Sequence, residues 1–429
     1  MRKYVILPSS SDLNRGDQAL VWETIEIAKK GKRVGEYYML ASELNRTKQS
    51  QEAGIKILSP ILKHPSRMFK SKENNEYNNI LLFKWGMVAI FDFIFSLLIL
   101  SPPLRYILKH IMSTEDRRTL QVIEESEACF VKGGGFIHSA GRITDSYIVY
   151  YQLFHIMLAQ SMRKPVYVMP NSFGPFPGFG VKWLVTKTLN NCELVTVRES
   201  ISKSMLDGID VKSEIFPDLG FSLDKNRRKN KELLNIRSKY PGKRLVAITA
   251  RPYRFPNSEN PNKKYKEYIS GMANFSRWLF ENKYVPVFIE HTLSETTHEN
   301  DGNAIAEITA KLDIGSYEVL ANDDYNCRDL KSIYSEMDFV VGTRFHSVIF
   351  SLAENIPSIA ITYGGNKGQG IMKDLGLSDY ALSMSEFDLN QIIHMFNNLV
   401  ENSELVREQL VEINKVIKIK HNDLSLSIS

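Results

Sequence analysis

The stretch Val340-Val341-Gly342-Thr343-Arg344-Phe345-His346-Ser347 predicts a strand-to-helix junction in an open α/β sheet. Its apolar beginning is typical of a buried strand that ends at Gly342, and a helix is expected to open at Phe345. Ligands bind at the carboxyl ends of such strands, beside the free N–H groups of the following helix. Arg344 and His346 stand at this point, and a guanidinium binds anions while an imidazole moves protons near neutral pH. The pair predicts either an anion-binding active site or an arginine paired with a local carboxylate, beside a histidine that caps a carbonyl.

Two further cations occupy equivalent positions along the chain. Arg198 follows a strand predicted over residues 194–197, and Lys367 lies in a glycine turn after a strand predicted over 358–361. Cations at three strand ends of parallel sheets can converge on one anion. Their spacing therefore favours the functional interpretation of the opening stretch.

The first half of the chain offers candidates of a different chemistry. A strand over Lys3 to Pro8 leads through a polar loop into a helix expected from about Asp17 to Lys30, which is the opening of a doubly wound domain. Asp17 is either a helix cap or a carboxylate at an acceptor site. Glycines 133–135 end another strand and let a ligand approach the backbone closely. His138 follows them, and a functional and a structural role are equally open for it.

The length and rhythm of the chain predict two domains. At 429 residues a single core is improbable, and strands alternate with helices throughout. We expect an N-terminal Rossmann-like domain over residues 1–225 and a C-terminal one over 240–395. Residues 396–429 are expected to form C-terminal helices and a tail. The polar, charged stretch from Asp224 to Gly242 is the predicted boundary.

The composition of the chain limits which partners and which cellular compartment are expected. The net charge of +5 is compatible with acidic substrates or an anionic membrane surface, but no basic stretch interleaved with aromatics predicts a nucleic-acid partner. Cys129, Cys192 and Cys327 form neither a zinc spacing nor a disulfide framework, which favours a reducing compartment. The chain begins directly in a strand, without the apolar region of a signal peptide. We expect a cytoplasmic protein.

Residues 80–112 interrupt the α/β rhythm with an apolar insert. Trp85 to Leu100 is almost wholly apolar except for Asp92, and a second, amphipathic piece follows the prolines at 102 and 103. A single membrane pass would place strands of one domain on opposite sides of a bilayer, and the run falls short of the ~20 apolar residues of a span. The insert is either a helical hairpin in the membrane interface or a buried or partner-binding helix pair. Its crowded Phe and Trp residues favour the membrane.

Seven short motifs follow one another along the chain: Asn14-Arg15-Gly16-Asp17, Gly133-Gly134-Gly135, Ser172-Phe173-Gly174-Pro175, Val197-Arg198-Glu199-Ser200, Pro217-Asp218, Arg344-Phe345-His346-Ser347 and the glycine turn that carries Lys367. In this order they resemble the polysaccharide pyruvyl transferase family, and the resemblance covers about residues 4 to 395. The apolar insert lies outside the pattern, and Leu13 stands where a glycine is commoner.

The resemblance implies a GT-B-like enzyme with two Rossmann-like domains facing across a cleft. Such enzymes transfer the enolpyruvyl unit of phosphoenolpyruvate to two sugar hydroxyls, forming a pyruvate ketal and releasing phosphate. It implies that Arg344, His346, Arg198 and Lys367 serve the donor. His346 is the candidate for acid/base work, and His138 and Asp17 would face the acceptor. The remaining predicted substrate-binding residues are Phe345, Asn14, Gly134, Gly135 and Ser172, and neither a metal nor another cofactor is expected.

The acceptor is expected to be a saccharide of an exopolysaccharide or capsule, either lipid-linked or a repeat unit. The insert would then hold the enzyme peripherally on the inner face of the plasma membrane. One alternative is a glycosyltransferase of the same fold with a nucleotide-sugar donor, for which Glu354 could hold the ribose. Another is a non-enzymatic, membrane-docked scaffold whose working part is the insert.

Overall fold

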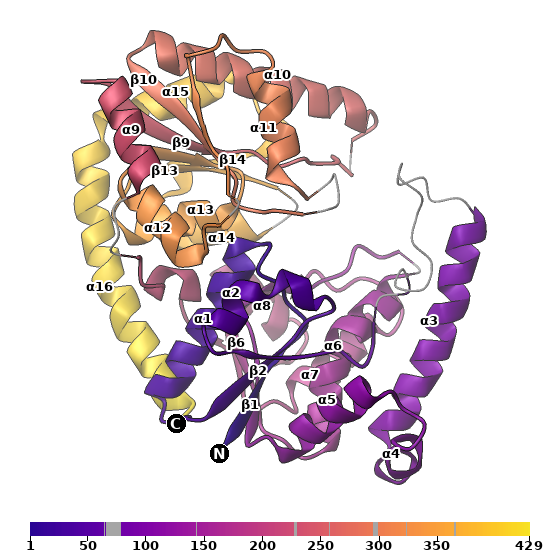
Figure 1. Ribbon diagram of the computed structural model, residues 1–429. Coiled ribbons are helices and arrows are strands. Elements are labelled where there is room, and N and C mark those ends of the chain that lie inside the picture. Colours follow the sequence, from indigo (N-terminus) through magenta and orange to yellow (C-terminus); the bar gives the residue numbers. More distant parts are fainter. Residues whose placement is uncertain are drawn as a thin grey trace.

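The computed structural model describes residues 1–63, 65, 79–142, 144–226, 230–256, 258–294, 299–322, 324–363 and 366–429. Two α/β domains, each built on a parallel sheet, lie one above the other (Figure 1). The predicted pair of Rossmann-like domains and the apolar helix in the first of them are confirmed.

The N-terminal sheet has the strand order β3-β2-β1-β4-β6-β7-β8, and β5 pairs with β6. Its central strands are buried along nearly their whole length, because helices cover both faces of a parallel sheet. The order reverses between β1 and β4, which makes the carboxyl ends of these two strands the topological switch point. The strands are β1 Lys3–Leu7, β2 Glu36–Leu40, β3 Lys56–Leu58, β4 Ala128–Val131, β5 Gly134–Ile137, β6 Val166–Phe173, β7 Leu194–Val197 and β8 Glu214–Ile215.

The C-terminal sheet has the order β11-β10-β9-β12-β13-β14, and its switch point lies between β9 and β12. The two switch points face one another, because Gly134, which follows β4, and Arg344, which follows β12, line one cavity. The strands are β9 Arg244–Thr249, β10 Tyr284–Ile289, β11 Glu318–Leu320, β12 Phe339–Gly342, β13 Ser358–Thr362 and β14 Ala381–Ser383.

Helices connect and cover these strands. Those of the first domain are α1 Arg15–Lys30, α2 Lys48–Glu52, α3 Asn79–Leu100, α4 Pro102–Leu108, α5 Thr114–Glu125, α6 Asp145–Ser161, α7 Val181–Leu189 and α8 Ser200–Asp207. Those that follow are α9 Lys231–Lys239, α10 Pro261–Glu281, α11 Asp301–Thr309, α12 Cys327–Ser335, α13 Phe345–Ala353, α14 Asn366–Asp374, α15 Leu389–Glu401 and α16 Ser403–Ser427.

Two local predictions differ from the structure. The charged stretch expected as a domain boundary contains α9, whose Leu233 and Ile236 are buried in the core that contains the second sheet. Glycines 133–135 are not simply a turn, because Gly134 and Gly135 begin β5 and Gly134 pairs with Asn171 on β6. Gly134 has a φ of +142°, a backbone conformation that side-chain-bearing residues rarely adopt.

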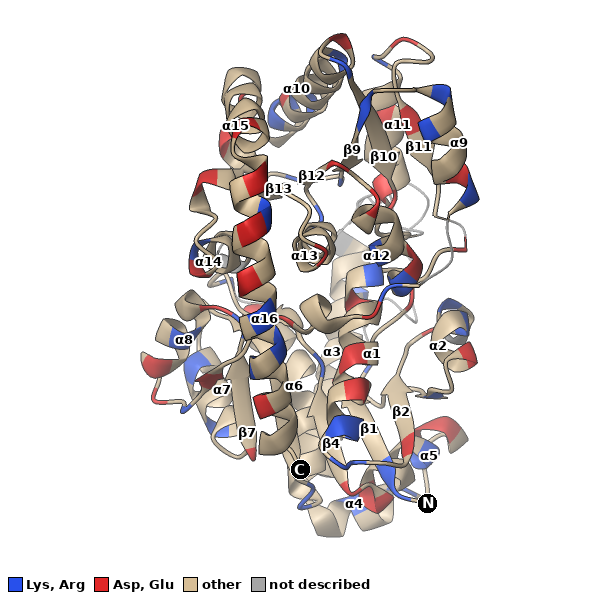
Figure 2. Ribbon diagram, turned by 90° about the vertical axis from the view of Figure 1, so that its left-hand side faces the viewer, with Lys and Arg blue, Asp and Glu red and all other residues tan. Residues whose placement is uncertain are grey.

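The last helix joins the two domains. α16 starts beside the C-terminal domain and runs down to α1 in the N-terminal domain (Figure 1), and charged residues of both signs lie along it (Figure 2). At its far end Leu424 and Ile428 are fully buried, and the Ile428 carbonyl accepts a hydrogen bond from Arg33 Nε at 2.9 Å. The tail expected after the C-terminal helices is thus helical to Ser427 and is attached to the first domain.

The apolar insert forms one long helix and a short one. α3 begins at Asn79, six residues before the apolar run predicted from Trp85, and residues 80–100 are long and apolar enough to cross a membrane by length and composition. Only 6% of an 18-residue apolar window within this stretch is buried, so a buried helix pair is the wrong interpretation within the described residues. β3 precedes α3 and β4 follows it, yet both belong to one sheet, so a single membrane crossing between these strands would place strands of one sheet on opposite sides of the bilayer.

Candidate functional site

A cavity of about 230 Å³ lies between the two switch points. It brings together eight of the predicted site residues, which come from both domains and from segments that are far apart in the chain. These eight are Asn14, Asp17, Gly134, Gly135, Arg198, Arg344, Phe345 and His346, and the lining also includes His291, Ile361, Thr362, Tyr363 and Gly368.

The first turn of α1 connects the domains at the floor of this cavity. Asn14 caps the helix, because its side-chain oxygen accepts hydrogen bonds from the N–H groups of Gly16 at 3.0 Å and Asp17 at 3.4 Å. Its backbone also forms a β-bridge with Thr292 of the C-terminal domain. The N–H of Leu293 donates to the Leu13 carbonyl at 2.8 Å, next to this bridge. The loop therefore fixes α1 against the opposite domain at the site.

Asp17 pairs with Lys132, the residue that follows β4. Lys132 Nζ lies 2.8 Å from Asp17 Oδ1, and the lysine is almost fully buried. Burial raises the pKa of Asp17, but Lys132, His346 and Arg198 outweigh burial and hold the pKa below its usual value. Asp17 is therefore a carboxylate at neutral pH, one that faces the cavity.

His346 crosses from the C-terminal domain to lie against α1. A Cβ atom on Gly16 would overlap the imidazole ring at Nδ1 and Cγ, so the absence of a side chain there makes room for the histidine. His346 Nε2 is buried, has no hydrogen-bond partner among the described residues and lies 3.9 Å from Asp218 Oδ2. Such an unsatisfied nitrogen is free to bond a ligand.

The surroundings keep this imidazole neutral. Burial lowers the pKa of His346, and Arg198 and Lys132 lower it as well, while Asp218 and Asp17 act in the opposite direction. The resulting pKa lies below the usual value of a histidine. His346 is therefore in the protonation state of a general base at neutral pH.

We expect Gly16→Ala to lower kcat/KM by about 10²-fold, because the added methyl group must displace the His346 ring, and a shift near 1 Å at a reacting group has an effect of this size. Steady-state assays of the variant measure it. Gly86→Ala is the control, since a Cβ atom there meets no atom within 4 Å. Unchanged activity of Gly16→Ala would contradict the contact.

Arg198 is held in place from behind by polar residues of the first domain. Its Nε donates to Ser172 Oγ at 2.7 Å, and its Nη1 lies 2.6 Å from Asp218 Oδ2. Ser172 in turn donates to Glu199, and burial raises the pKa of Glu199 to about 7. Ser172, predicted to bind substrate, is absent from the cavity lining and contacts Arg198 instead. Nη2 of Arg198 makes no hydrogen bond to any described residue.

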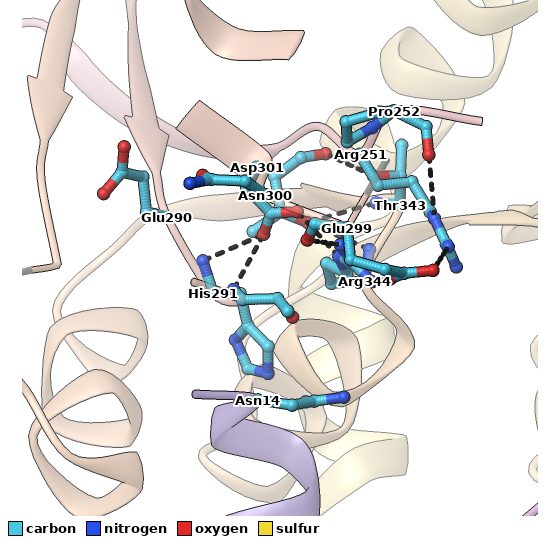
Figure 3. Close-up of polar contacts among 12 residues, drawn as sticks. Asn14, Arg251, Pro252, Glu290, His291, Glu299, Asn300, Asp301, Thr343 and Arg344 are labelled. Carbon is cyan, nitrogen blue, oxygen red and sulfur yellow. Dashed lines mark hydrogen bonds and ion pairs between the residues drawn. The ribbon is translucent and has the colours of Figure 1, made fainter. Parts of the chain in front are cut away.

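Arg344 has carboxylate partners of its own (Figure 3). Its Nε lies 2.7 Å from Asp301 Oδ1, and its Nη1 lies 3.2 Å from Glu299 Oε2. Asp301, the first residue of α11, is fully buried and also accepts hydrogen bonds from the N–H groups of His291 and Thr292. The guanidinium therefore pairs with local carboxylates, as one interpretation predicted, and it also lines the cavity; its role in binding an anion stays a prediction.

Sequence reasoning missed four residues around the cavity, and three of them could have been found. Lys132, Arg251 and His291 each come one or two residues after a parallel strand, as Arg198 and Arg344 do. His291 is buried, its Nε2 has no partner among the described residues, and its ring points toward Asn14 (Figure 3). Asp218 belongs to the Pro217-Asp218 motif but was given no role, because it does not directly follow a strand and only the fold brings it to Arg198 and His346.

Three other candidates lie apart from this group. His138 is exposed after β5 and is not part of the cavity lining, so its catalytic role stays a prediction. Lys367 is the second residue of α14, and its side chain lies outside the described residues. Glu354, considered for a nucleotide ribose, pairs with Lys225 at 2.7 Å and Lys331 at 3.7 Å and does not line the cavity. Over the described part of the chain, no cluster of His, Cys, Asp and Glu is arranged to hold a metal ion.

Two facing Rossmann-like domains with a polar cavity between their switch points define the GT-B-like class of fold. Solved structures agree on the fold. The chain matches Anabaena Alr3699/HepE, solved with UDP and glucose, at a TM-score of 0.53 and 9% identity over 98% of this chain and 95% of that one. It also matches a UDP-N-acetylglucosamine 2-epimerase from Listeria monocytogenes, at a TM-score of 0.56 and 12% identity. This match covers 96% of this chain and 91% of that one.

The chain belongs to the polysaccharide pyruvyl transferase family, whose model matches residues 14–365. A curated relative is the amylovoran biosynthesis protein AmsJ of Erwinia amylovora, 23% identical over 289 residues, which are 65% of this chain and 68% of AmsJ. Membership makes the chain a transferase of polysaccharide pyruvylation and confirms the resemblance found in the motifs.

Proposed function

We propose that this enzyme transfers the enolpyruvyl unit of phosphoenolpyruvate to two hydroxyls of one sugar in a lipid-linked saccharide. The products are a cyclic pyruvate ketal and inorganic phosphate. The observation that carries the proposal is the cavity in which Arg198 and Arg344 lie beside His346, whose neutral imidazole has an unpartnered Nε2. A compact, multiply charged anion and a proton acceptor are the reactants that such a site suits.

The donor carries a carboxylate and a phosphate, and the cavity offers charges for both. Arg198 has an unengaged Nη2, and the Nη1 contact of Arg344 is to Glu299, whose side chain is 52% exposed. A donor anion can replace this half-exposed carboxylate, whereas buried Asp301 stays as the anchor of the guanidinium. Gly368 in the first turn of α14 also lines the cavity, and the N–H groups of a helix start bind phosphate. Lys367 belongs to the same turn.

The protons of the reaction can be balanced without another cofactor. The oxygen of the first sugar hydroxyl bonds to C2 of the donor, and its proton passes to His346 and then to the C3 methylene, which becomes the methyl group. The oxygen of the second hydroxyl then bonds to C2 and the C2–O bond to phosphate breaks. The second proton leaves with the phosphate. Asp17, which is ionised and belongs to the opposite domain, would orient the acceptor hydroxyls.

A direct test is incubation with phosphoenolpyruvate and the saccharide repeat unit of the polysaccharide, followed by mass spectrometry of the saccharide and a phosphate assay. We expect equal amounts of ketal and phosphate. A thermal-shift comparison with a panel of nucleotide sugars distinguishes the glycosyltransferase alternative. Stabilisation by a nucleotide sugar, with no phosphate released from phosphoenolpyruvate, would reject the proposal.

The apolar face of α3 supports attachment to the cytoplasmic surface of the membrane. Phe83, Phe91 and Ile94 expose half or more of their surface along one helix. Membrane binding scales with such buried apolar area. We expect the double variant Phe91→Glu, Ile94→Glu to move from the membrane fraction to the soluble fraction with its fold unchanged by circular dichroism. An unaltered distribution would show that α3 is not the attachment.

A further inference from the structure

A second cavity lies on the outer side of the N-terminal domain, between α3 and α7, with α6 as its floor. It measures about 730 Å³, within the range of small-molecule sites. Phe93, Leu97 and Leu100 of α3 form one wall, and Val181, Trp183 and Leu184 of α7 form the other. We call this cavity the α3–α7 groove.

The walls of the groove are fixed rather than loosely apposed. Phe93 packs edge-on against Tyr150 of α6 with ring centroids 4.7 Å apart, and Ser96 Oγ hydrogen-bonds to the Tyr150 hydroxyl at 2.7 Å. α7 also packs on α6. The groove is therefore a preformed apolar channel, which costs little to fill compared with one that a ligand must open.

The groove is continuous with the exposed apolar face. Phe179 is 95% exposed and Trp183 is 64% exposed, and both line the groove together with Leu97 of α3, which is itself 43% exposed. Residues 79–112 together with α7 carry five Lys or Arg against the single Asp92. Lys187 lies at the groove with its Nζ 5.0 Å from the centre of the Trp183 ring. An apolar channel edged by cations fits a hydrocarbon chain that bears an anionic head.

One end of the groove lies toward the carboxyl edge of the sheet. Phe179 belongs to the loop after β6, and its carbonyl accepts a hydrogen bond from Ser146 Oγ at 2.6 Å. Gly134 and Gly135, which line the active cavity, sit on β5 beside the end of β6. A chain in the groove would thus lead toward the side of the domain on which the active cavity opens.

We infer that the α3–α7 groove binds the long hydrocarbon chain of the phospholipid-like carrier that bears the saccharide acceptor. The inference rests on the proposed function, since it assigns a site to the lipid part of that acceptor. It places recognition of the lipid on α6 and α7 as well as on the insert, and it separates lipid recognition from the chemistry at His346.

The test uses a substitution that fills the groove without removing apolar surface. Leu97 lines the groove, whereas its neighbour Leu98 does not, and the two are similarly exposed at 43% and 38%. Leu97→Trp should raise the KM for a long-chain polyprenyl-linked saccharide about tenfold, the loss expected when roughly two buried CH₂ groups return to water. Leu98→Trp should leave this KM unchanged, and neither change should alter transfer to the free saccharide.

A second measurement does not depend on the reaction. Native mass spectrometry with a long-chain polyprenyl phosphate in detergent should show one lipid bound with the same affinity to the wild type and to Leu98→Trp, and bound about tenfold more weakly to Leu97→Trp. If both variants bind the lipid as the wild type does, or both bind it more weakly, the groove is not the binding site. If the lipid affinities are as expected while phosphoenolpyruvate is not consumed, the groove stands and the proposed reaction fails.

Discussion

Replacing His346 with asparagine should lower kcat/KM for phosphoenolpyruvate-dependent phosphate release by about 10²–10⁴-fold, the usual contribution of a general acid or base. Asparagine fits the space beside Gly16 but cannot carry a proton between the sugar hydroxyl and the C3 methylene. Steady-state phosphate release, with circular dichroism to verify the fold, measures the effect. His394→Asn is the matched control, because His394 is an exposed histidine of α15 and is not part of the cavity lining.

The pH dependence of kcat/KM is a second test of His346. The pKa of His346 is lowered by burial first, so the neutral base accumulates as the pH rises through a value below 6.5. The kcat/KM of the wild type should therefore rise across that acidic range and level off above it. His346→Asn should lack this acid limb. A variant that keeps both the limb and most of the activity would remove His346 from the proton path.

Replacing Asp301 with alanine should give the largest loss of stability that we expect of a single substitution near the cavity, about 3–5 kcal/mol. The change leaves the Arg344 guanidinium buried without its closest carboxylate, and it removes the acceptor of the N–H groups of His291 and Thr292. For a domain of this size the melting temperature should fall by roughly 10 °C. Differential scanning fluorimetry is sufficient to detect it.

The control for Asp301→Ala is a substitution in a solvent-exposed ion pair on the protein surface. Glu26 lies 2.9 Å from Lys29 on α1, and both side chains are 40% exposed or more, so Glu26→Gln should change stability by less than about 1 kcal/mol. If Asp301→Ala melts within a degree or two of the wild type, the Arg344–Asp301 pair is not a structural anchor. The donor would then have to meet an Arg344 that is free to move.

Much of the site could be predicted because its signals are local. A strand of apolar residues followed at once by Arg198 or Arg344 places each arginine at the carboxyl end of a parallel strand, and these ends meet at the switch points. The same rule extends to Lys132 and His291, which follow β4 and β10 within two residues but were not selected from the sequence. For these residues, the position just after a parallel strand was the signal that predicts a place near the cavity.

What the sequence could not supply is contact between distant segments. Gly16 is a glycine because His346, 330 positions later in the numbering, needs its space, and nothing near Gly16 reveals this. Asp218 and Asp301 likewise form ion pairs with arginines that lie far from them in the sequence, Arg198 and Arg344. The insert was predicted from residue 80, and α3 begins at Asn79; the apolar run was expected only from Trp85, although residues 80–83 are apolar as well.

The closure of α16 onto α1 has a consequence for the order of assembly during synthesis. Arg33 and Ile428, which hydrogen-bond, are separated by 395 positions. Domains usually fold as they leave the ribosome, the first before the second. Here the side of α1 that packs on α16 stays uncovered until residue 428 has left the ribosome. The first domain therefore exposes apolar surface until the second domain has been synthesised. Truncation before Leu424 should leave an N-terminal domain that depends on chaperones, even though its sheet is complete by Ile215.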